Sequence, residues 1–134
     1  MKPVFGDTAY FLALVNSRDQ LHAQAVALSR QPPGPLVTTE WVLMELGNAL
    51  SVPTGRQKFS RLVDTLRAQP DVTIIGAGPA MFARACRWFD ERQDKAWSLT
   101  DCTSFLIMEE QGLEMALTAD LHFEQAGFRR LMRL

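Results

Sequence analysis

Short apolar runs alternate along the chain with longer segments whose apolar positions recur every three or four residues. The short runs predict strands, because their residues are apolar and partly β-branched, and the periodic segments predict amphipathic helices. The predicted strands cover residues 4–5, 36–38, 72–75 and 115–118, with a candidate edge strand at 128–131. The predicted helices cover residues 8–16, 19–30, 39–51, 56–68 and 80–92, and a last helix begins at Ser98 or Thr100 and ends near Gly112.

Proline and glycine mark the breaks between these segments. The sequence QPPGP at residues 31–35 ends one helix, and Pro53 with Gly55 is predicted to close the helix over residues 39–51. Pro70 ends the following helix, and residues 76–79 form the turn into the next one.

The order of the segments predicts the fold class. Strands that alternate with one or two helices favour a parallel sheet covered by helices on both faces. A length of 134 residues fits one domain, and no repeat or low-complexity tract divides the chain. We therefore predict a single α/β domain over residues 1–134 with a central parallel sheet of about five short strands.

Composition narrows the classes of function. Apolar residues make up 47% and charged residues 22% of the chain, as in ordinary globular proteins. A net charge of −1 supplies no global basic field, so a nucleic-acid ligand needs a local patch or a metal ion. The longest apolar run, residues 9–15, is far shorter than the roughly 18 residues of a membrane span. No apolar signal-peptide core precedes Asp7, so a cytoplasmic protein without membrane contact is expected.

Acidic residues stand where the predicted elements meet. Asp7 directly follows the first strand and Asp120 the fourth, so both are expected at the carboxyl edge of the sheet, where ligands bind in such folds. Asp101 lies in the first turn of its helix, where a negative charge is favoured, and its place relative to that edge is harder to predict.

Two glutamates compete for a further position. Glu40 and Glu45 are five residues apart on one helix, which places them about 140° apart around its axis. Glu40 is explained by its place in the first helical turn. Glu45 lies between Met44 and Leu46, where an unpaired carboxylate is costly, and a neighbouring metal ion would offset that cost.

Carboxylates that converge repel one another unless a cation lies between them. Oxygen ligands select hard ions such as Mg²⁺ or Mn²⁺. Such ions orient a phosphodiester, activate a bound water and stabilise the leaving oxygen. The acids therefore predict a metal-dependent phosphodiesterase.

Four segments of the sequence resemble the PIN-domain ribonucleases, in particular the toxins of VapBC toxin–antitoxin modules. They are VFGDTAYFLAL from Val4, TTEWVLMEL from Thr38, DKAWSLTDCTSF from Asp94 and ALTADLHFEQAGF from Ala116. The resemblance spans essentially the whole chain. It implies a five-stranded parallel sheet with helices on both faces and an acidic Mg²⁺ or Mn²⁺ site. It also implies endonucleolytic cleavage of RNA by activated water, which leaves 5′-phosphate and 3′-hydroxyl ends, as well as a cognate antitoxin and a homodimer.

The resemblance also implies roles for individual residues. Asp7, Glu45, Asp101 and Asp120 match the four acids of the family, so that all four are candidate catalytic residues and metal ligands. Asp7 and Asp101 would be the principal ligands, Glu45 would complete the shell or orient the water, and Asp120 would bind a second metal or act through water. The hydroxyls of Thr8, Ser98 and Thr118 would support these ligands.

Two other functions stay open on the sequence alone. In the first, His22 and His122 act as acid and base in a metal-independent nuclease that uses the RNA 2′-hydroxyl, although we interpret His122 as a hydrogen-bonded structural residue. In the second, the domain keeps its fold and acids but only binds RNA or protein.

Overall fold

The computed structural model describes all residues, 1–134, and contains one fully parallel sheet of five strands in the order β3-β2-β1-β4-β5. The strands are β1 (Val4–Gly6), β2 (Leu36–Thr39), β3 (Val72–Ile75), β4 (Met115–Leu117) and β5 (Arg129–Arg130). The helices are α1 (Thr8–Val15), α2 (His22–Arg30), α3 (Glu40–Ala49), α4 (Pro53–Ala68), α5 (Pro79–Glu91), α6 (Leu99–Gln111) and α7 (Leu121–Gln125).

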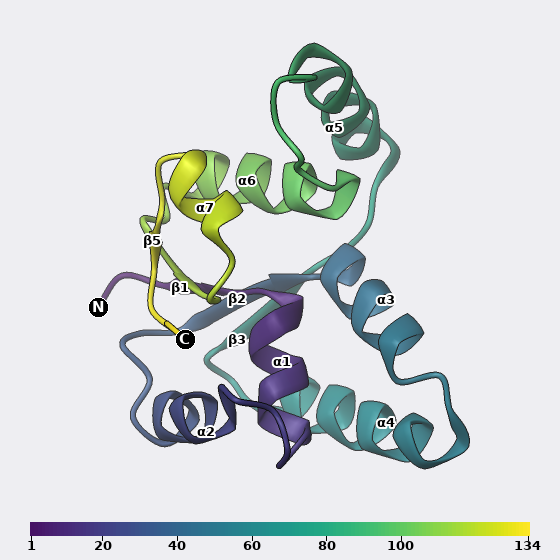
Figure 1. Ribbon diagram of the computed structural model, residues 1–134, viewed down its shortest axis with the longest axis vertical. Helices are drawn as coiled ribbons and strands as arrows, with labels where there is room; N and C mark the ends of the chain where they lie inside the picture. The colour runs from purple at the N-terminus through teal and green to yellow at the C-terminus, as the bar shows by residue number, and fades with distance from the viewer.

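Helices cover both faces of this sheet, as Figure 1 shows. Helices α6 and α7 lie on one side, with α5 packed against α6, whereas α1, α2 and α4 lie on the other side. The predicted three-layer α/β architecture is therefore confirmed. None of the helices is long and apolar enough to cross a membrane.

Strands β1 and β4 are neighbours at the centre of the sheet, although they come from opposite ends of the chain. Their register pairs Phe5 with Ala116 and Gly6 with Leu117. The backbone N–H of Asp7 donates to the carbonyl of Leu117 at 3.3 Å. The residues that follow the two strands consequently lie side by side at the carboxyl edge.

Helix α6 runs through the core, and Phe105 is its central residue. The ring of Phe105 is fully buried. Its centroid lies 4.9 Å from the ring of Phe123 and 5.1 Å from that of Trp97, both edge to face. Every residue from Asp101 to Met108 is buried, so this helix is covered on all sides. The packing fixes α6, which carries Asp101, against α7.

The structure departs from the predicted boundaries at proline. Pro53 does not close α3 but occupies the first turn of α4, and Pro79 likewise begins α5. Proline suits this position because the first N–H groups of a helix have no partner within it. Gly112 ends α6 with a φ of 68°, as expected for a helix-terminating glycine.

Helix α7 was not predicted. It has only five residues, which is too short for a helical period to be visible in the sequence. The candidate edge strand at residues 128–131 is confirmed but shortened to Arg129–Arg130.

Candidate active site

Asp7 lies at the end of β1 and begins α1, with only 5% of its surface exposed. Its Oδ2 accepts a hydrogen bond of 2.8 Å from the hydroxyl of Thr118, the residue that follows β4. The pKa of Asp7 is raised from 3.8 to about 7, chiefly by burial and also by the charges of Asp101 and Asp120, while the Thr118 hydrogen bond acts in the opposite direction. A carboxylate in this position is charged only at a considerable cost.

Asp101 is buried in the first turn of α6 and forms a capping box with Ser98. The Ser98 hydroxyl accepts from the Asp101 N–H at 2.9 Å, and Asp101 Oδ2 accepts from the Ser98 N–H at 3.0 Å. Burial raises the pKa of Asp101 and the charge of Asp120 adds to it, against the lowering effects of Ser98 and His122. The capping box fixes the direction of this carboxylate.

Asp120 follows β4 and begins α7. Its Oδ1 accepts from the N–H of His122 at 2.9 Å, and its own N–H donates to the Thr118 hydroxyl at 3.0 Å. Thr118 therefore bonds to both Asp7 and Asp120. Of the three hydroxyls expected to support the acids, those of Thr118 and Ser98 do so, whereas the buried hydroxyl of Thr8 has no hydrogen-bond partner.

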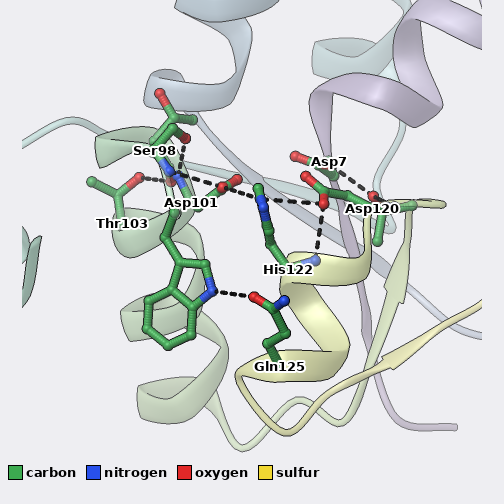
Figure 2. Close-up of polar contacts among 10 residues, drawn as sticks. Asp7, Ser98, Asp101, Thr103, Asp120, His122 and Gln125 are labelled. Carbon is green, nitrogen blue, oxygen red and sulfur yellow. Dashed lines mark hydrogen bonds and ion pairs between the residues drawn. The ribbon is translucent and has the colours of Figure 1, made fainter. Parts of the chain in front are cut away.

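His122 points into this acidic cluster from α7, as Figure 2 shows. Its Nδ1 lies 3.2 Å from Asp101 Oδ2 and 3.3 Å from Asp120 Oδ1. The three residues offer ligand atoms that all lie within 4.8 Å of one another. The sequence reading of His122 as a hydrogen-bonded residue is right, but it missed that the partners are the acids of the site. The available signal was its spacing, two residues after Asp120.

Asp7 is not part of this group of ligand atoms, although the charges of Asp101 and Asp120 act on it, and neither is Glu45. Glu45 lies half-buried on α3, and no hydrogen bond or ion pair joins it to another side chain. Its role therefore stays a prediction. Glu40 is exposed, and its Oε1 accepts from the backbone N–H of Ala77 at 2.7 Å, which holds the start of α5 to α3.

The two histidines of the rival mechanism are not brought together. His22 lies on α2, where its Nδ1 contacts the carbonyl oxygen of Ala13 at 2.7 Å. His122 lies on α7 among the acids. No contact joins the two side chains, so the structure does not support a paired acid and base.

The donor set fits a divalent cation. No lysine or arginine forms an ion pair with Asp7, Asp101 or Asp120. Asp101 Oδ1 and Asp120 Oδ2 accept no hydrogen bond from the protein. Converging carboxylates with unused oxygens repel one another, and a hard cation between them offsets this repulsion.

A comparison with known protein families matches residues 4–129 to the PIN domain. The chain belongs to the PIN domain family.

Curated relatives of this PIN domain include the 23S rRNA-specific endonuclease VapC20 of Mycobacterium tuberculosis, which is 27% identical over 125 residues. The match covers 93% of this chain and 95% of that protein. The crystal structure of VapC20, described as a sarcin–ricin loop cleaving toxin, superposes with a TM-score of 0.85 at 26% identity, covering 96% of this chain and 98% of that one. VapBC2 from Rickettsia felis, solved with a promoter DNA fragment, shares the fold with a TM-score of 0.65 at 12% identity, covering 96% of each chain.

Replacing Thr118 of this PIN domain with valine is expected to raise the pKa of Asp7 above about 7. The hydroxyl hydrogen bond stabilises the charged carboxylate, and valine keeps the shape but not the donor. The variant should also lose about 1–3 kcal/mol of stability, since the Asp120 N–H loses its acceptor. Carbon-13 NMR of the Asp7 carboxyl in metal-free protein measures the pKa. Thr118→Ser retains the hydroxyl and is the control; equal pKa values in both variants would contradict the assignment.

Proposed function

We propose that this PIN domain is a metal-dependent endoribonuclease and the toxin of a type II toxin–antitoxin pair. The observation that carries the proposal is that Asp7, Asp101 and Asp120 lie near one another at the carboxyl edge of a PIN sheet, without a lysine or arginine partner. The similarity to VapC20 over nearly the whole chain supports the choice of RNA as the substrate.

In this proposal Asp7, Asp101 and Asp120 hold Mg²⁺ or Mn²⁺, and Glu45 completes the shell or orients the attacking water. When bound, the ion activates the water and neutralises the charge of the leaving oxygen. The protein holds the carboxylates in fixed orientations before an ion binds. Thr118 occupies one oxygen of Asp7 and Ser98 occupies one oxygen of Asp101, so rotation of both carboxylates is restricted before the ion arrives.

The similar proteins also suggest which RNA and which protein partner this chain binds. VapC20 is named for cleavage of 23S rRNA, so ribosomal RNA is the first substrate to test for this chain. A toxin–antitoxin complex from Klebsiella pneumoniae shares the fold with a TM-score of 0.61. We accordingly infer a cognate antitoxin as the partner, a homodimer as the assembly and the cytoplasm as the place of action.

Cleavage of total cellular RNA by the purified protein tests the proposal. We expect cuts with 5′-phosphate and 3′-hydroxyl ends in Mg²⁺ or Mn²⁺, and none in EDTA or with Asp101→Asn. That variant keeps an acceptor for the Ser98 N–H, so its fold should persist and circular dichroism can verify this. Cleavage that persists in EDTA would refute the metal mechanism. RNA binding without cleavage under every condition would instead support the non-catalytic binding module.

A further inference from the structure

His122 is the one residue of the acidic cluster that offers nitrogen. Its Nδ1 faces Asp101 Oδ2 at 3.2 Å and Asp120 Oδ1 at 3.3 Å, so a single ring atom lies between two carboxylates. The side chain comes from α7, and the N–H of the same residue donates to Asp120 Oδ1. Both the backbone and the ring of His122 are thus tied to the acids, as Figure 2 shows.

The spacing of these atoms suits ligands of one ion. Ligands that surround a small divalent ion octahedrally at about 2.1 Å lie about 3 Å from their nearest neighbours. The two distances from Nδ1 are close to this value. A hydrogen on Nδ1 can donate to Asp101 Oδ2, and a divalent ion that takes the place of this hydrogen would be attracted both by the Nδ1 lone pair and by the carboxylates. With 29% of its side chain exposed, His122 can be reached from solvent.

A nitrogen ligand changes which ion is preferred. Carboxylate oxygens suit Mg²⁺ and Mn²⁺ alike, whereas imidazole is a softer donor that favours first-row transition metals over Mg²⁺. Mg²⁺ also gives up its water reluctantly and is usually held by one or two carboxylates. An imidazole in the ligand set therefore adds more affinity for a transition metal than for Mg²⁺.

We propose that His122 Nδ1 is a metal ligand alongside Asp101 and Asp120, and that the resulting mixed nitrogen–oxygen site binds a first-row transition ion in preference to Mg²⁺. This inference rests on the proposed metal-dependent function. It deepens that function, because it assigns a ligand outside the four acids and the chemical class of the ion.

Electron spin echo spectroscopy with Mn²⁺ tests the ligand directly, since a coordinated imidazole gives modulation from its ¹⁴N nucleus. We expect this modulation in the wild-type protein and its loss in His122→Ala. His22→Ala is the matched control, because it removes the only other histidine and leaves the acidic cluster unchanged. Modulation in His22→Ala but not in His122→Ala identifies the nitrogen.

Calorimetric titrations of the protein with Mn²⁺ and with Mg²⁺ measure which ion the site prefers. His122→Ala is expected to weaken Mn²⁺ binding by about tenfold or more and Mg²⁺ binding much less. His122→Asp keeps a ligand but exchanges nitrogen for oxygen, so the ratio of the Mn²⁺ to the Mg²⁺ affinity should fall by about tenfold. Circular dichroism of each variant checks that the fold is retained.

The outcomes separate this inference from the proposed function. Mn²⁺ binding that Asp101→Asn abolishes, but without ¹⁴N modulation, would overturn the role of His122 and leave the metal-dependent nuclease intact. An unchanged affinity ratio in His122→Asp would overturn the preference for a transition ion. Absence of any Mn²⁺ or Mg²⁺ binding that depends on Asp101 would overturn both the inference and the metal mechanism.

Discussion

Replacing Asp7 with asparagine is expected to abolish RNA cleavage while raising the thermal stability of the metal-free protein. Cleavage should fall by more than about 100-fold, because even residues that merely support metal ligands contribute about 10- to 100-fold. Asparagine keeps an acceptor for the Thr118 hydroxyl but carries no charge. The variant therefore removes the repulsive charge that the site concentrates in the absence of a cation.

The stability gain should depend on pH. The pKa of Asp7 is raised from 3.8 in the unfolded chain to about 7 in the fold, so the fold favours the protonated acid. The contribution of Asp7 to the free energy of unfolding is most favourable below pH 4, falls as the pH rises towards 7, and is least favourable above pH 7. Compared with low pH, the charged Asp7 carboxylate lowers the free energy of unfolding by roughly 4 kcal/mol at pH 8, since each pKa unit corresponds to about 1.4 kcal/mol. We expect a gain on the order of 10 °C in Tm at pH 8 that disappears near pH 4.

Thermal unfolding of metal-free protein across this pH range measures the effect. Asp64→Asn is the control, since Asp64 is exposed on α4 and its neutralisation should alter Tm little at any pH. A lower Tm for Asp7→Asn at pH 8, or an equal gain at pH 4 and pH 8, would contradict the assignment of Asp7 as a buried carboxyl whose pKa is raised by the fold.

Replacing Phe105 with alanine should bring the protein close to unfolding. The ring is fully buried between Trp97 and Phe123, and deleting such a ring costs about 3–5 kcal/mol. A domain of this size has about 5–15 kcal/mol of total stability. Because Phe105 joins α6 to α7, the proposed metal binding by Asp101 and Asp120 should weaken as well.

Urea denaturation gives the change in free energy of unfolding. Phe82→Ala is the matched control, since this ring is 44% exposed on α5 and its loss leaves the core intact. We expect the Phe105 variant to lose several times more stability than the Phe82 variant. Equal losses would show that the aromatic cluster around α6 does not anchor the fold.

The sequence alone was sufficient for the architecture and for part of the site. Each strand of the sheet falls within one or two residues of a predicted run, because short apolar segments between breaks have few alternatives. Asp7 and Asp120 were predicted to share an edge from the rule for parallel sheets, and the Asp7 to Leu117 hydrogen bond places them there.

The other features of the site and the fold depend on tertiary packing, which local sequence patterns do not predict. Asp101 comes close to Asp120 because the contacts of Phe105 with Trp97 and Phe123 hold α6 against α7. His122 reaches the acids because α7 forms, and five residues give no periodic signal. Pro53 was assigned to the end of α3, since the sequence cannot show whether a proline ends one helix or begins the next.

The central pairing of β1 with β4 also bears on the order in which activity arises during translation. Asp7 precedes its hydrogen-bond partner Thr118 by 111 residues in the chain, and Asp120 follows Thr118. A nascent chain that ends before β4 therefore has no complete acidic cluster, however well its first half has folded. Activity that needs both Asp7 and Asp120 can therefore arise only after β4 and the start of α7 have been synthesised.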